Sequence, residues 1–190
     1  MTDLRTAHPY RQFPKDTAML RLFACAAALL VSAAAASAHV TLETQEATVG
    51  SAYKAVLRVP HGCDGKATVA VRVKLPEGFI AAKPMPKPGW ELKTIKGKYA
   101  KAYELWGEKV SEGVQEIDWT GGNLPDDFYD EFVLRGTLAG DLPAGQMLYF
   151  PVVQECEGGA VERWIQIPQA GQGEDDLETP APGIRLLPKK

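Results

Sequence analysis

The chain contains little histidine and little cysteine, with three residues of each among 190. Beyond the first 38 residues only His39 and His61 remain, and a Ser-His-Asp triad would have to use His61. No serine stands in a nucleophile-elbow setting, and no glycine-rich phosphate loop follows a strand and opens a helix. Carboxylates are plentiful, which leaves two-carboxylate chemistry open, but no spacing singles out a pair. The sequence therefore carries no motif of a serine hydrolase or of a nucleotide-binding enzyme.

Long apolar runs are missing too, apart from one near the N-terminus. Residues 20–38 combine one positive charge, a short apolar core and small residues at Ala36 and Ala38. This pattern is typical of a signal peptide that is cut after Ala38, and the run is too short for a spanning helix with proper flanks. We predict a signal peptide over residues 1–38, with Met19 as an alternative start. The mature protein is then expected in the periplasm or secreted, with no membrane anchor after cleavage.

An excess of basic residues is also absent. The 21 lysines and arginines are outnumbered by 24 aspartates and glutamates, which gives a net charge of −3. Nucleic-acid-binding domains carry basic patches, often with interleaved aromatic residues, and this sequence has none. The charge balance therefore argues against a nucleic-acid partner.

Two cysteines, Cys63 and Cys156, lie beyond the predicted cleavage site. An even pair in an oxidising compartment most simply forms one disulfide bond, so we predict a Cys63–Cys156 bridge. Two separate buried thiols or a soft thiolate metal site are the alternatives. The second of these is weakened because neither cysteine has a close Cys-x-x-Cys partner.

Apolar and polar residues alternate with period two through most of residues 39–190, and no amphipathic helical stretch is found. Such alternation predicts half-buried antiparallel strands, which turn signals separate. We predict one domain over residues 39–190, an all-β two-sheet antiparallel sandwich of immunoglobulin or fibronectin type with one disulfide. Residues 169–190 are expected to be loop-rich, with an edge strand at 184–187. The predicted strands cover residues 53–59, 69–73, 90–95, 103–107, 117–120, 131–138, 147–154 and 161–167.

His39 becomes the first residue if the chain is cut after Ala38. Its new α-amine and its own Nδ1 can then bind one metal ion together in a six-membered chelate ring. An idle histidine that merely follows the cleavage site is the alternative. A second feature is Trp164, because Val161, Ile165 and Ile167 mark the apolar face of their strand and place the tryptophan on the polar face. A tryptophan there either serves a site or closes the end of the sandwich.

Several short motifs in order give the chain a resemblance to the YcnI-like copper-binding domain family. They are Ala38-His-Val-Thr-Leu42, Pro88-Gly-Trp90, Trp119-Thr-Gly-Gly122, Tyr129-Asp-Glu-Phe132 and Arg163-Trp-Ile165. The resemblance implies a secreted β-sandwich that binds one Cu(II) by a monohistidine brace, and it places the site on His39, Glu131 and Trp164. Amine, imidazole and carboxylate donors suit Cu(II) independently of the resemblance. Asp130, Glu43 and Glu155 are alternatives to Glu131.

The leading hypothesis is a periplasmic copper chaperone or reservoir and not an enzyme, with other periplasmic copper-handling proteins as partners. A copper monooxygenase is the second hypothesis, and it needs His61 to join His39 at one metal. An adhesion or assembly module without metal is the third. We interpret His61 as a loop histidine, because Pro60 and Gly62 on either side already explain a turn there.

Overall fold

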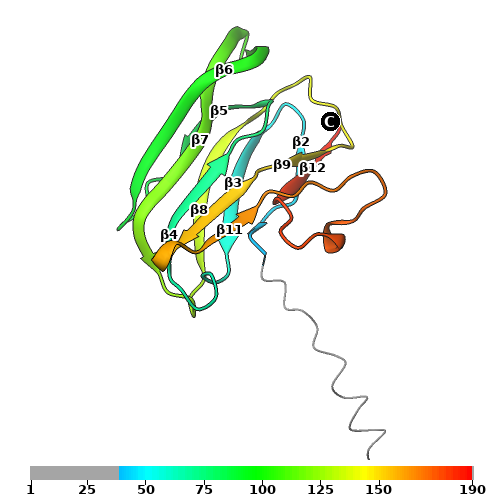
Figure 1. The fold of residues 1–190 in the computed structure, drawn as a ribbon. Coiled ribbons are helices and arrows are strands. Elements are labelled where there is room, and N and C mark those ends of the chain that lie inside the picture. The colour runs from blue at the N-terminus through cyan, green and yellow to red at the C-terminus, as the bar shows by residue number, and fades with distance from the viewer. Residues whose placement is uncertain (1–38, 190) are drawn as a thin grey trace, which may run out of the picture. The chain divides into compact units, whose positions relative to one another are not determined.

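The computed structural model describes residues 39–189, and strands make up most of them (Figure 1). The predicted signal peptide, residues 1–38, lies outside the described residues. The strands are β1 (Thr41–Leu42), β2 (Glu46–Thr48), β3 (Ala52–Val59), β4 (Thr68–Lys74), β5 (Phe79–Pro84), β6 (Glu91–Leu105), β7 (Glu108–Leu124), β8 (Asp130–Leu138), β9 (Met147–Tyr149), β10 (Val152–Cys156), β11 (Val161–Trp164) and β12 (Gly183–Leu187). Two 3-10 turns, η1 (Glu157–Gly159) and η2 (Glu174–Asp176), are the helical elements in this part of the chain.

Two larger sheets form the sandwich. One has the strand order β1-β3-β8-β5 and the other the order β11-β10-β4-β7-β6, and neighbouring strands in both are antiparallel. The period-two pattern of β3 buries every second side chain because successive side chains point to opposite faces of a sheet. The core between the sheets includes the fully buried Leu57, Val59, Val71, Val73, Ile117, Trp119, Phe132 and Leu134. The predicted all-β sandwich is confirmed.

A third sheet of three strands, in the order β2-β12-β9, was not predicted. Strand β12 pairs in parallel with β2 and antiparallel with β9, so the expectation of two purely antiparallel sheets is incomplete. The edge strand predicted at 184–187 is in fact the central strand of this small sheet. Ile184 and Leu186 are buried in the main core, which explains why a loop-rich segment ends in a strand.

The β6–β7 hairpin joins segments that the sequence suggested as separate strands. Residues 90–95 and 103–107 fall largely within one long strand, β6, which pairs with β7 with register shifts on the way. At its tip, Trp106 and Gly107 form a two-residue turn in which both residues have positive φ, 51° and 87°. Such turns match the twist of the flanking strands, and glycine adopts this conformation without strain.

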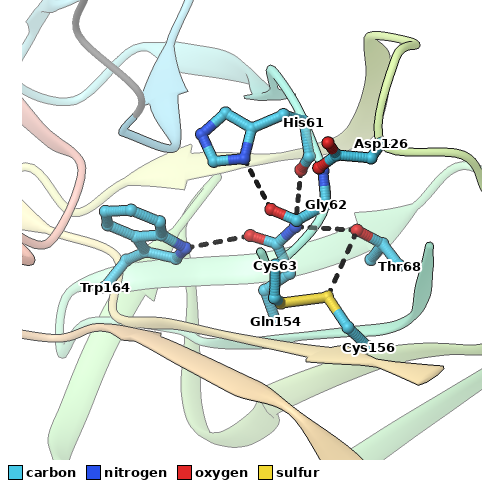
Figure 2. The surroundings of a disulfide bond; sticks show 8 residues. All are labelled: His61, Gly62, Cys63, Thr68, Asp126, Gln154, Cys156 and Trp164. Atoms are coloured by element: carbon cyan, nitrogen blue, oxygen red, sulfur yellow. Dashed lines mark hydrogen bonds between the residues drawn. A yellow bond between two sulfur atoms is a disulfide. The ribbon is translucent and has the colours of Figure 1, made fainter. Parts of the chain in front are cut away.

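The disulfide between Cys63 and Cys156 is present, with the two Cα atoms 6.0 Å apart (Figure 2). Cys63 lies in the connection between β3 and β4, and Cys156 ends β10. The bridge therefore fixes the loop that follows β3 to a strand of the opposite sheet. No helix among the described residues is long and apolar enough to cross a membrane.

Candidate metal centre

His39 is held at the start of the described chain by the residues that follow it. Val40 and Leu42 are each only 2 % exposed and belong to the main core. Strand β1 pairs with β3, with Thr41 opposite Arg58. His39 is itself half-buried. Its backbone position is set by the buried residues that follow it in the chain.

Trp164 lies inside the sandwich, and the predicted facing of its strand is wrong. The tryptophan is 4 % exposed and packs in the main core, whereas Val161, Ile165 and Ile167 are 40 %, 44 % and 52 % exposed. Its partner across the ladder is the fully buried Val152, which fixes the inward face of β11. An edge strand can expose apolar side chains, and for this reason apolar alternation misled the prediction.

The structure brings His39 and Trp164 together. Their ring centroids are 5.5 Å apart with the planes tilted by 54°. His39 precedes β1, the edge strand of the four-stranded sheet, and Trp164 ends β11, the edge strand of the five-stranded sheet. The contact therefore joins the edge strands of the two sheets, and it places the indole beside the imidazole.

A buried glutamine that the sequence analysis did not single out organises the polar groups behind this contact. Gln154 is 1 % exposed, and its amide oxygen accepts a hydrogen bond of 3.1 Å from the Trp164 indole N–H. Its amide nitrogen donates to the backbone oxygen of His61 and to Thr68 Oγ1, both at 2.7 Å (Figure 2). The sequence holds one sign of it: Gln154 is a polar residue at the same alternate positions of a strand as Val152 and Cys156, which predicts that it faces inward.

His61 lies in the loop after β3, as the sequence analysis predicted, but its ring is not simply solvated. Its Nδ1 lies 2.5 Å from the backbone oxygen of Gly62. A carbonyl oxygen only accepts hydrogen bonds, so Nδ1 carries the proton of this contact. The other nitrogen, Nε2, is buried and has no hydrogen-bond partner among the described residues.

Glu131 lies on β8, which pairs with β3 on the side opposite β1. Its neighbour Phe132 points into the core, so Glu131 faces the outside of the four-stranded sheet, where it is opposite Arg58. The Tyr129 hydroxyl donates a hydrogen bond to Glu131, and this bond raises the pKa of the tyrosine. Within residues 39–189 no hydrogen bond or ion pair links Glu131 to His39. Its role as a ligand stays a prediction.

The three alternative carboxylates are each paired with a cation. Glu43 lies 3.3 Å from Arg58, Asp130 lies 2.6 Å from Lys87, and Glu155 lies 2.8 Å from Arg72. The hydrogen bond from Arg72 holds the pKa of Glu155 below its usual range. Glu131 accepts a hydrogen bond from a neutral hydroxyl, and no ion pair to it is found within residues 39–189. A metal would therefore compete with an ion pair at each of the three alternatives.

Nitrogen donors dominate what this region can offer a metal ion. No group of three or more His, Cys, Asp or Glu side chains within residues 39–189 is arranged to hold a metal. An α-amine on His39, which exists only after cleavage, would add one nitrogen to the imidazole of the same residue. The buried, unpartnered Nε2 of His61 is a further nitrogen in the adjoining loop. Cu(II) is the divalent ion that such donors bind most tightly.

Comparisons with known proteins place the chain. A search of curated proteins finds no match. An uncharacterized protein from Nocardia farcinica, whose crystal structure reveals an immunoglobulin-like fold, aligns with a TM-score of 0.58 and 28 % identity over 80 % of this chain and 99 % of that one. A cohesin module from a Clostridium perfringens family 33 glycoside hydrolase aligns with a TM-score of 0.40 and 11 % identity over 80 % and 97 %, too weakly to carry an argument.

A family model also matches more than half of the chain. Residues 39–186 match the family described as a domain of unknown function, DUF1775. This match begins at His39 and includes Trp164 and both cysteines. It agrees with the resemblance drawn from the sequence motifs, because this domain is the one that characterises YcnI-like proteins. The chain therefore belongs to the DUF1775, or YcnI-like, family.

Proposed function

We propose that this protein is a periplasmic Cu(II)-binding protein, a copper chaperone or reservoir that binds one copper ion through His39 at its mature N-terminus. The observation that carries the proposal is the position of His39. The residues Val40 and Leu42 that follow it are buried in the core, and its ring lies 5.5 Å from that of Trp164, centroid to centroid. A flexible terminal histidine would lose conformational freedom on binding a metal, whereas an anchored one has lost most of it already.

Each residue of the proposed site has a separate role. His39 supplies its α-amine and Nδ1 as two nitrogen donors, and a bound Cu(II) would supply affinity for such donors and a one-electron redox couple. Trp164 lies beside the imidazole, with the two ring centroids 5.5 Å apart. Glu131, which has no cation partner among the described residues, is the proposed carboxylate donor. The amine must lose its proton to bind, so copper binding should release protons.

Equilibrium titration with Cu(II) against a competing chelator tests the proposal, on protein that begins at His39. One copper per chain is expected for this form, and no binding above the level of the His39→Ala protein would refute it. An assay with ascorbate and a polysaccharide separates the binding protein from a copper monooxygenase, because an enzyme would turn over and a chaperone would not. Protein without copper affinity would point to the adhesion or assembly alternative.

A further inference from the structure

We propose that His61 is a second imidazole ligand of the copper bound by His39, and that it binds through Nε2. This inference rests on the proposed function, and it names a donor for that same site. The starting observation is that His61 Nε2 is buried and without a hydrogen-bond partner among the described residues. A buried polar atom that lacks a partner carries a free-energy cost, and metal coordination is one way to remove it.

The hydrogen bond on the other ring nitrogen sets the chemistry of Nε2. Nδ1 must donate its proton to the Gly62 carbonyl oxygen at 2.5 Å, because a carbonyl has no proton to give. In the neutral ring, Nε2 therefore carries the lone pair. An imidazole whose N–H is held by a backbone carbonyl is the usual arrangement of metal-binding histidines, since the carbonyl fixes both tautomer and ring orientation.

The loop around His61 is rigid, so the ring is presented in a fixed place. The backbone N–H of Gly62 donates to Asp126 Oδ1 at 3.0 Å, and a Cβ on Gly62 would collide with the Lys66 carbonyl oxygen. Cys63 and Lys66 exchange two backbone hydrogen bonds, of 3.0 Å and 2.9 Å. The disulfide then joins this loop to β10. A ligand on such a loop needs little reorganisation before it binds a metal.

Two links bring this loop toward His39. Strand β1, which begins two residues after His39, pairs with β3, which ends two residues before His61. Gln154 binds the His61 backbone oxygen at one end of its amide and the Trp164 indole at the other. Trp164 in turn contacts the ring of His39. In Figure 2 the His61 imidazole and the Trp164 indole extend to the same side of the Gln154 amide.

The resulting donor set differs from a single-histidine site. The α-amine and Nδ1 of His39 and Nε2 of His61 make three nitrogen donors, which suit tetragonal Cu(II). A carboxylate or water would complete the coordination, so the inference is compatible with Glu131 as a ligand but does not require it. The inference also assigns a role to His61, which the turn formed by Pro60 and Gly62 does not require.

Pulsed electron paramagnetic resonance of the Cu(II) protein that begins at His39 provides a direct test, because it counts coordinated imidazoles. Two equatorial imidazoles are expected, and one imidazole in the wild-type spectrum would overturn the inference while leaving the proposed function intact. Absence of any bound copper would instead refute the proposed function. This readout needs no variant, so it does not depend on how a substitution folds.

His61→Asn is the matched variant. The asparagine amide can still donate to the Gly62 carbonyl in place of Nδ1–H, but it has no atom at the position of Nε2. We expect the variant to keep its disulfide and unfolding midpoint, to lose one imidazole from the spectrum, and to bind Cu(II) at least about tenfold more weakly. His61→Ala should recover affinity when free imidazole is added. Unchanged affinity and an unchanged spectrum in both variants would refute the proposal.

Discussion

The Trp164 indole donates a hydrogen bond of 3.1 Å to the amide oxygen of Gln154. This bond connects the aromatic residue beside His39 to a buried polar side chain. Both polar atoms of the Gln154 amide have partners, because its nitrogen also donates twice, to His61 and Thr68. Buried polar groups that are fully satisfied specify one arrangement of their neighbours. The position of the indole next to His39 is therefore set by hydrogen bonding as well as by packing.

The first prediction concerns this bond. Trp164→Phe keeps an aromatic ring but removes the N–H donor, so the Gln154 oxygen is left buried without a partner, at a cost of about 1–3 kcal/mol in the free energy of unfolding. Urea denaturation measures the change. Trp106→Phe is the control, because Trp106 is 86 % exposed at the hairpin tip and its loss should change stability by no more than about 0.5 kcal/mol. Equal stabilities for the two variants would contradict the role of the bond.

The second prediction concerns the terminal amine. Protein that retains Ala38, or begins with Met before His39, has an amide in place of that amine, and an amide is a much poorer donor. We expect it to fold normally but to lose much of its Cu(II) affinity. For protein that starts at His39, affinity should fall as pH drops below about 7.7, the usual pKa of an α-amine, because protons then compete with the metal. Competition titrations at several pH values on both proteins measure this, and equal affinities would exclude the amine as a ligand.

The third prediction concerns the carboxylate. Glu131→Gln should weaken Cu(II) binding and change the copper spectrum without unfolding the protein, because Glu131 lies on the outer face of its sheet. Asp130→Asn is the matched control and should bind copper normally, since Asp130 is paired with Lys87. Chelator competition and absorption spectra compare the two. Normal binding by the glutamine variant together with weak binding by the Asp130 variant would identify Asp130 as the ligand.

The fourth prediction concerns the disulfide. Replacing Cys63 and Cys156 together by serine should lower the free energy of unfolding by about 2–4 kcal/mol, because the bridge closes a long loop between residues with a sequence separation of 93. Denaturant unfolding of the oxidised protein and of the double variant gives this difference. Intact-mass analysis after thiol labelling should detect no free thiol in mature protein from the periplasm. Two labelled cysteines there would show that the bond does not form in the cell.

The fifth prediction concerns Arg72, which lies 3.0 Å from Asp118 and 2.8 Å from Glu155 on the strands at either side of it. The Asp118 side chain is only 5 % exposed, so Arg72→Met leaves a buried carboxylate without its cation and should cost roughly 3–5 kcal/mol of stability. Adding Asp118→Asn to Arg72→Met should recover part of this loss, as thermal unfolding can show. A single variant as stable as the wild type would contradict the prediction.

The ion pair between Arg72 and Glu155 makes stability depend on pH. Arg72 lowers the pKa of Glu155 in the folded protein. The stability that this carboxylate contributes is therefore fully present above its unfolded pKa of about 4.3 and is lost as pH falls through the lower folded pKa. Wild type and Glu155→Gln should therefore differ most in unfolding free energy near neutral pH and converge in acid. Because Glu155 is about a third exposed, solvent screening keeps the effect small.

The sequence predicted the sandwich and the disulfide because both leave local marks. Alternation in β3 reports directly which side chains are buried, and two cysteines in a chain with a predicted signal peptide have few other uses. The third sheet left no such mark, since β12 takes its place through long-range pairing with β2. Trp164 was placed on the wrong face because an edge strand has only one neighbour, and its outer apolar residues can remain exposed.

The candidate metal centre was only partly predictable. The small residues before His39 mark it in the sequence, and the contact with Trp164 supports that choice. Neither Gln154 nor the unpartnered nitrogen of His61 could be recognised in advance, because both depend on where the β3–β4 loop meets β10. Glu131 was carried over from a motif, and a motif does not report which face of a sheet a side chain occupies.

The burial of Val40 has a consequence for how a chain that begins at His39 would resist proteolysis. Aminopeptidases trim chains from the first residue, and they need several residues in an accessible, extended form. In a chain cut after Ala38, freeing His39 for such an enzyme means withdrawing Val40, which is 2 % exposed, and losing about 1.5–3 kcal/mol of apolar burial. Leu42 adds a similar barrier one step later. The terminal residue is thereby protected from trimming by the residues that position it.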